Sequence, residues 1–219
     1  MTSSVRTARD IVTRGLRKAG LLGFGEVPSP EDAEVALQEL DDMLKGWQAE
    51  PYTLWTQATG SIALTTGAEH TLDPIRPLRL LSVRLRRNGV DIPMIRLTRD
   101  EYDRLPLKDA YGSPTLWFFD RQREAARLYV WPLTRAVAGE TLVYTYEREL
   151  PDLTSLNSEI DVPGEWWDAV VYNLAARLLE TVPVQANPNL AGRAQYLLDK
   201  ALANEQEGSV FFAGEWADW

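Results

Sequence analysis

The feature that most constrains the fold is a change of pattern along the chain, which is helical at both ends and strand-like in the middle. From Tyr52 to about Arg148 the sequence alternates short apolar runs with turn residues, as in SIALTTG, PTLWFFD, ARLYVWP and ETLVYTYER. Apolar runs bounded by Gly, Pro and Asn are typical of β-strands. Because this section lies in the middle of the sequence, the chain must leave the helical domain after the first helices and return to it for the last ones.

Two helices are predicted before the strand-like section and two after it, because apolar residues recur there at helical spacing. The second helix has the clearest start, with Ser29 as N-cap and Pro30 at the first helical position. The expected helices cover about residues 4–20, 30–50, 165–182 and 189–207.

Within the middle section, local signals predict individual elements. The Asn88-Gly89 pair predicts a hairpin between Val83–Arg87 and Val90–Leu97. A second hairpin is expected between PTLWFFD and RLYVWP, and a short helix at about Arg99–Leu105, capped by Thr98.

The fold class that follows is α+β: a four-helix bundle with an antiparallel β insertion between helices two and three, and an extended aromatic C-terminal tail. The corresponding segments are residues 1–51 for the first two helices, 52–150 for the inserted β domain, 151–207 for the last two helices and 208–219 for the tail.

Composition argues against most catalytic chemistry. The chain has no cysteine and one histidine, His70, so disulfides, thiol nucleophiles and a four-ligand zinc site are not expected. No GxGxxG or GxxxxGK[ST] pattern is present. The adjacent acids Asp41 and Asp42 point in different directions on a helix, and a solvated face is expected there. We therefore predict no catalytic residue, no metal and no cofactor.

Charge and hydropathy argue against nucleic acid and membranes as binding partners. A net charge of −9 argues against a protein whose main task is gripping nucleic acid. No apolar run approaches the roughly 20 residues of a membrane-spanning helix, and the N-terminus lacks the apolar core of a signal peptide. We therefore expect no membrane partner, and we expect the protein to be synthesised in the cytoplasm.

Two segments are candidate partner surfaces. The basic hairpin, with Arg84, Arg86 and Arg87, is either a solvated strand face or a contact for an acidic partner; DNA-backbone contact is a third option. The last thirteen residues, EGSVFFAGEWADW, either pack on their own subunit or bind another protein. In the second case the anchors are the aromatics Phe211, Phe212, Trp216 and Trp219.

The order of these features resembles the head-to-tail adaptor, or connector, proteins of tailed bacteriophages. The matching stretches are ARDIVTRGLRKAG, LDDMLKGWQAE followed by LW, the pair PTLWFFDRQ and LYVWPL, and TYERELPDLT with DVPGEWWDAVVYNLAARLLE. None of them is a catalytic signature, and together they cover most of the chain.

The resemblance implies a non-enzymatic virion protein at the head–tail junction, assembled in the host cytoplasm. It implies a ring, commonly of twelve copies, beneath the portal protein, with tail or nozzle proteins attached below. DNA would pass through the channel without specific binding, and the C-terminal segment would reach the portal or a neighbouring subunit. In such a ring we expect the first two helices of one subunit to face the last two of its neighbour. Two other functions stay open: a virion-associated peptidoglycan hydrolase and a DNA-binding packaging factor.

Overall fold

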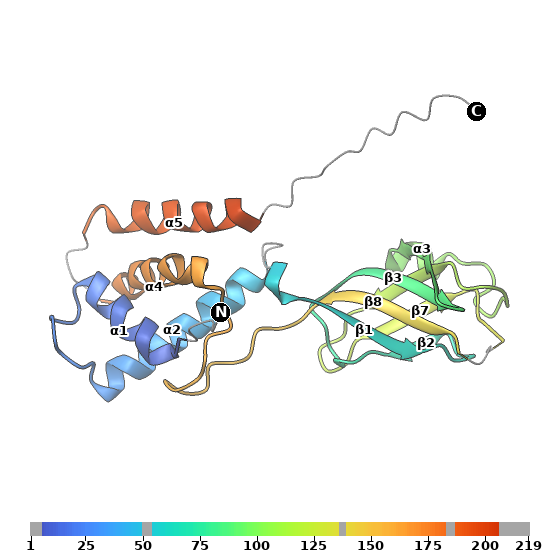
Figure 1. Ribbon diagram of the computed structural model, residues 1–219, viewed down its shortest axis with the longest axis horizontal. Helices are drawn as coiled ribbons and strands as arrows, with labels where there is room; N and C mark the ends of the chain where they lie inside the picture. Colours follow the sequence, from blue (N-terminus) through green and yellow to red (C-terminus); the bar gives the residue numbers. More distant parts are fainter. Residues whose placement is uncertain (1–5, 50–53, 136–138, 183–186, 206–219) are drawn as a thin grey trace, which may run out of the picture. The chain divides into compact units, whose positions relative to one another are not determined.

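The computed structural model describes residues 6–49, 54–135, 139–182 and 187–205 (Figure 1). The chain divides into two compact units. The helical unit comprises Met1–Trp55 and Leu150–Trp219, and the β unit comprises Thr56–Glu149. Each unit has its own hydrophobic core.

The helical unit contains α1 (Ala8–Ala19), α2 (Pro30–Ala49), α4 (Trp167–Glu180) and α5 (Leu190–Glu205), with the short 3-10 helix η2 (Gly164–Trp166) directly before α4. A second 3-10 helix, η1 (Leu54–Thr56), lies where the chain passes from one unit to the other. Ser29 caps α2 as predicted, because its Oγ accepts a hydrogen bond from the Asp32 N–H at 3.1 Å.

Helix α4 is the centre of the helical unit, and α1, α2 and α5 all pack on it. Gly15 lets α1 approach α4 closely, since a Cβ there would lie 2.9 Å from Cδ2 of Leu174. The fully buried Trp166 also belongs to this core. Its ring centroid lies 5.8 Å from that of Trp47 and 5.0 Å from that of Trp55. The most deeply buried aliphatic residues around it are Ile11, Val12, Leu40, Val170 and Leu174.

The β unit consists of two four-stranded sheets. The first has the order β1-β8-β3-β4 and is antiparallel throughout, with β1 (Gln57–Ala63), β8 (Thr141–Glu147), β3 (Arg79–Arg87) and β4 (Val90–Pro93). The second has the order β2-β7-β6-β5, with β2 (Glu69–Thr71), β7 (Arg127–Trp131), β6 (Leu116–Asp120) and β5 (Ile95–Leu97). One apolar core holds residues of both sheets, including Leu80, Leu85, Trp117, Leu128, Leu142 and Tyr144.

The predicted four-helix bundle is wrong. The described residues form five α-helices and two sheets of four strands each, in an α+β fold with a large β-rich part. The fifth helix is α3 (Arg99–Asp103), inside the β unit. In the helical unit, α1, α2 and α5 each pack on α4. Helix α5 contacts mainly α4 and η2. The predicted aromatic tail lies outside the described residues.

The β section is also not purely antiparallel. Strands β5 and β6 pair in parallel, and the chain between them contains α3. The predicted second strand of the Asn88-Gly89 hairpin is divided at Met94, whose N–H still donates to Val83 O in the first sheet at 3.0 Å. The next N–H, of Ile95, donates to Thr115 O at 2.8 Å, so the chain changes sheets at this point.

Several local predictions are confirmed. Strands β3 and β4 form the hairpin around Asn88-Gly89, and β6 pairs antiparallel with β7. Helix α3 begins after Thr98, whose Oγ1 accepts from the Glu101 N–H while the Glu101 carboxylate accepts from the Thr98 N–H. Such a capping box supplies partners for backbone donors that the helix itself leaves free.

Candidate assembly surfaces

The predicted hairpin arginines lie on β3, where acids of the same unit neutralise them. Arg86 donates to both carboxylate oxygens of Asp91, at 2.6 and 2.9 Å, across the register of β3 and β4. Arg84 lies 3.6 Å from the same carboxylate. The hydrogen bond from Arg86 lowers the pKa of Asp91. Two arginines thus share one acid on the surface of this hairpin.

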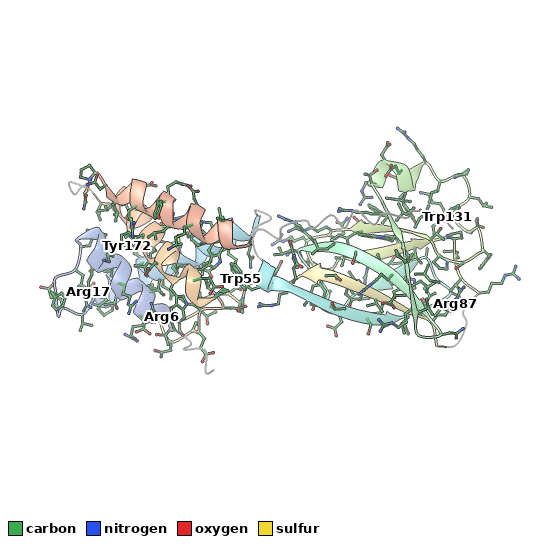
Figure 2. All side chains as sticks on the ribbon, turned by 45° about the horizontal axis from the view of Figure 1, so that its top comes forward. Arg6, Arg17, Trp55, Arg87, Trp131 and Tyr172 are labelled. Atoms are coloured by element: carbon green, nitrogen blue, oxygen red, sulfur yellow. The ribbon has the colours of Figure 1, made fainter. Side chains whose placement is uncertain are left out.

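Arg87, labelled in Figure 2, has a more buried partner than its neighbours. Its guanidinium donates to the carboxylate of Glu140, which is only 4% exposed, and to Ser113 Oγ at 3.3 Å. An acidic partner of the hairpin would have to compete with Asp91 and Glu140 for these three arginines.

Ion pairs between side chains of the same unit are common in the β unit and rare in the helical unit. Among the described residues, the β unit contains nine ion pairs and the helical unit two, Lys45–Asp152 and Arg177–Glu39. The helical unit holds twenty Asp and Glu against nine Lys and Arg, a net charge of −11. The β unit holds twelve against fourteen, a net charge of +2, and the two sum to −9. The helical unit is thus strongly acidic and pairs few of its charges internally.

Helix α1 carries most of the exposed positive charge of the helical unit. Its buried side consists of apolar residues and Gly15, and its outer side presents Arg9, Arg14, Arg17 and Lys18 together with a single acid, Asp10. A hollow of about 260 Å³ lies on this side, between α1 and the loop that follows it. Its lining consists of three arginines, two acids and three other residues: Arg9, Asp10, Thr13, Arg14, Arg17, Glu26, Val27 and Pro28.

Helix α2 carries the opposite charge on its outer side. Its exposed acids are Glu31, Asp32, Glu34 and Asp42, and Val35 is exposed among them at 44%. Asp32 accepts from the Ser29 hydroxyl at 2.7 Å, while Glu31, Glu34 and Asp42 have no ion pair within the part of the chain that the structure describes.

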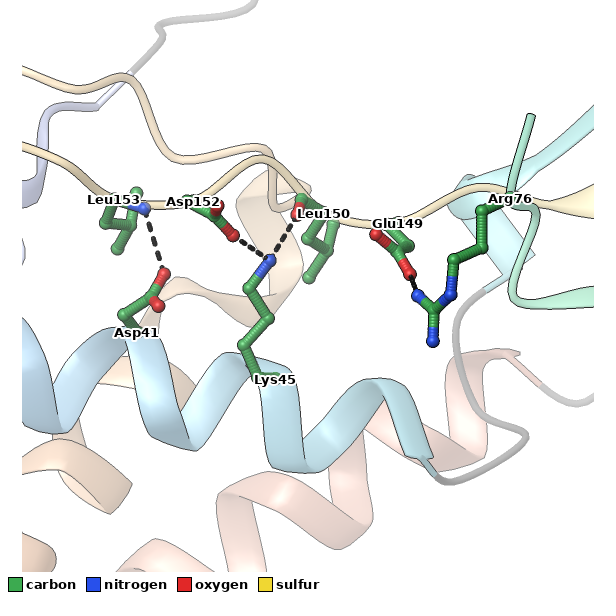
Figure 3. A network of polar contacts seen from close by, with 7 residues as sticks. All are labelled: Asp41, Lys45, Arg76, Glu149, Leu150, Asp152 and Leu153. Atoms are coloured by element: carbon green, nitrogen blue, oxygen red, sulfur yellow. Dashed lines mark hydrogen bonds and ion pairs between the residues drawn. The ribbon is translucent and has the colours of Figure 1, made fainter. Parts of the chain in front are cut away.

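The partly exposed edge of α2 has a structural task (Figure 3). Asp41 Oδ1 accepts a hydrogen bond from the Leu153 N–H at 2.9 Å. One turn later, Lys45 Nζ donates to Leu150 O at 2.7 Å and pairs with Asp152 at 2.5 Å. Residues 150–153 are thereby fixed to α2 where the chain re-enters the helical unit. Asp41 is therefore a partly buried backbone acceptor and does not belong to a fully solvated face.

No metal-binding group of three or more His, Asp or Glu side chains occurs in the described ranges. His70 lies on β2, 4% exposed, with Nδ1 3.3 Å from Thr65 Oγ1. Burial lowers the pKa of His70 below its ordinary value. None of the described helices is long and apolar enough to cross a membrane.

The predicted tail anchors Phe211, Phe212, Trp216 and Trp219 lie outside the described residues, so the structure does not place them. The opposite charge of the outer sides of α1 and α2 was not predicted from the sequence. The signal was present, since Arg9, Arg14 and Arg17 fall off the apolar stripe of the first helix.

The chain thus combines an acidic helical unit, on which exposed charges have no ion pair among the described residues, with an inserted β unit. The family model described as SU10 adaptor protein matches residues 6–211. The chain therefore belongs to the SU10 adaptor protein family, a family of phage head-to-tail adaptors. This membership identifies it as a phage structural adaptor with a place in the virion, and it confirms the resemblance found in the sequence. A search of curated proteins finds no match.

Proposed function

We propose that the protein is a non-enzymatic adaptor that assembles as a ring beneath the portal, extends the DNA channel and provides the attachment platform for tail components. The observation that carries this proposal is the family match, which spans residues 6–211 and therefore both units. A ring of twelve copies is the expected size.

The charge of the chain supports a channel that does not bind DNA. At −9 per copy, a ring of twelve would carry on the order of −100 charges. Phosphate groups would be repelled from such a wall, so DNA could move without adhering to it. The arginines that could attract phosphate in the β unit are largely paired with Asp and Glu of the same unit.

Two contact surfaces belong to this proposal. Phe211, Phe212, Trp216 and Trp219 serve as anchors in apolar pockets of the portal or a neighbouring subunit, because buried aromatics dominate interface energies. The second surface consists of Arg84, Arg86 and Arg87, which bind an acidic surface of a neighbouring component. The carboxylates of that component replace Asp91 and Glu140 as the ion-pair partners of these arginines.

The deciding experiment is the native mass of the purified protein, alone and after mixing with the portal ring encoded in the same genome. The proposal predicts a complex that gains about one adaptor copy per portal subunit. Absence of association at every salt concentration would overturn it. Clearing of cell-wall preparations, or salt-sensitive duplex binding lost on neutralising Arg84, Arg86 and Arg87, would then indicate one of the two other functions.

A further inference from the structure

The two units treat their charges differently, and this difference points to a contact surface. In the β unit most arginines have a carboxylate of the same unit beside them. On the outer sides of α1 and α2, in contrast, charges of opposite sign are exposed and have no ion pair among the described residues. Interfaces between molecules bring complementary charges together, so these exposed charges form a candidate contact surface.

We define the α1 stripe as Arg9, Arg14, Arg17 and Lys18. Arg9 approaches Asn157 Oδ1 at 3.5 Å, and Arg17 donates to Glu26 O at 3.1 Å; both contacts leave the positive charge without a carboxylate. Figure 2 shows Arg17 at the outer surface of the helical unit. The hollow beside the stripe has apolar lining from Val27 and Pro28. The loop before them exposes Phe24 completely.

We define the α2 stripe as Glu31, Glu34, Val35 and Asp42. Acids in the first turn of a helix are favoured by the helix dipole, which accounts for Glu31 without any partner. Asp42 lies three turns further on, where the dipole gives no such benefit, and Glu34 is at the end of the first turn. The exposed Val35 gives this acidic stripe an apolar centre.

We propose that the α1 stripe of one copy binds the α2 stripe of the next copy. The inference rests on the proposed ring and names the contact that closes it. The partner is a second copy because one chain carries exposed charges of both signs, on two different helices of one unit. Val35 of one copy then faces the hollow at Val27 and Pro28 of the other, with the acids around it meeting the arginines. A contact between two different patches is heterologous, which is the kind that closes into rings.

This pairing replaces the expectation that the first two helices face the last two of the neighbour. It also gives the positive stripe a role, since on an acidic unit this stripe attracts other copies of the same acidic unit. Exposed pairs gain little energy in water. The stripes therefore determine which surfaces meet and in which register more than they supply affinity.

The test uses two charge-reversal variants of the full chain. Arg9→Glu with Arg14→Glu reverses the α1 stripe, and Glu34→Arg with Asp42→Arg reverses the α2 stripe; none of these side chains is buried. Assembly on the portal ring is measured by native mass. For each variant alone, the adaptor concentration that fully occupies the portal ring should be at least about tenfold higher than for wild type. An equimolar mixture of the two should recover wild-type occupancy, because alternating copies present complementary stripes to each other.

A matched control is Arg121→Glu with Arg123→Glu, which makes the same charge change at exposed positions of the β unit. The control should assemble like wild type. Wild-type assembly of either stripe variant, failure of the mixture to recover, or equal loss in the control would each overturn the stripe contact. Absence of any complex with the wild-type chain would instead overturn the proposed function. Far-UV circular dichroism establishes that every variant is folded.

Discussion

Tyr144 lies over Gly60, its neighbour in the register of β1 and β8, and this contact organises one end of the β unit. The Tyr144 hydroxyl donates to Asp73 O at 2.7 Å and accepts from the Asp73 N–H at 3.0 Å. A Cβ at residue 60 would lie 2.6 Å from the Tyr144 ring. The fully buried ring can pass to Asp73 only because residue 60 has no side chain.

We therefore expect Gly60→Ala to lower the free energy of unfolding by about 1–3 kcal/mol, since the ring must shift and strain its hydrogen bonds. Urea unfolding of the full chain, followed by near-UV circular dichroism, measures the change. Gly46→Ala is the control, because a Cβ there meets nothing within 4 Å and lies in α2, where Ala is favoured by up to about 1 kcal/mol. Equal effects of the two substitutions would contradict the steric explanation.

His70 gives the β unit a defined response to acid. Burial lowers the pKa of His70, so the folded state resists protonation more than the unfolded state. As pH falls below about 6.5 the unfolded chain takes up the proton first, and the free energy of unfolding decreases until the lower folded pKa is passed. We expect His70→Asn, with no titrating group, to lose less stability than wild type between pH 7.5 and 5. Parallel urea midpoints of the two proteins over this range would refute the prediction.

At the scale of elements, α2 does more than fill the core, because Asp41 and Lys45 hold the returning chain. Asp41→Ala removes the acceptor of the partly buried Leu153 N–H. We expect a loss of about 1–2 kcal/mol in the free energy of unfolding, measured by urea unfolding. The adjacent Asp42→Ala changes the same charge at an exposed position and should stay within about 0.5 kcal/mol of wild type. A loss at Asp41 no larger than at Asp42 would show that the hydrogen bond does not matter.

Elements whose signals are local were predictable from sequence, and pairings between distant segments were not. The Ser29 cap, the Thr98 capping box and the Asn88-Gly89 hairpin depend on residues a few positions apart. The division of the strand at Met94 depends instead on Val83 in one sheet and Thr115 in the other. The arrangement of helices around α4 likewise depends on packing, which helical periodicity does not specify.

The same distinction holds for the candidate surfaces. Arg84, Arg86 and Arg87 could be recognised as a basic cluster, but the partner of Arg87 is Glu140, far along the chain. Whether a charge is free for a partner is therefore decided by the fold. The stripes of α1 and α2 differ in this respect, because helical spacing alone places their charges on the side away from the core.

At the scale of the whole molecule, the division of charge separates two tasks. The helical unit, at −11, carries the exposed charges of both signs that we assign to contacts between copies, while the β unit, at +2, neutralises most of its own. Exposed charges are screened within about 8–10 Å at physiological salt, so each stripe acts only on a surface that is already close. Charge then selects the neighbour and its register, and apolar side chains supply the remaining affinity.

Replacement of the C-terminal aromatics should affect attachment to the portal and not folding. Because we propose that Trp216 and Trp219 bind a partner, their replacement by Ala should leave the fold unchanged. Loss of two aromatic anchors should weaken binding to the portal ring by at least about 2 kcal/mol, roughly thirtyfold in the dissociation constant. Deletion of residues 209–219 should abolish incorporation altogether. The measurement is native mass of portal mixtures, with Glu215→Ala and Asp218→Ala as the matched control in the same segment. Full incorporation of the truncated chain would assign portal attachment to another surface.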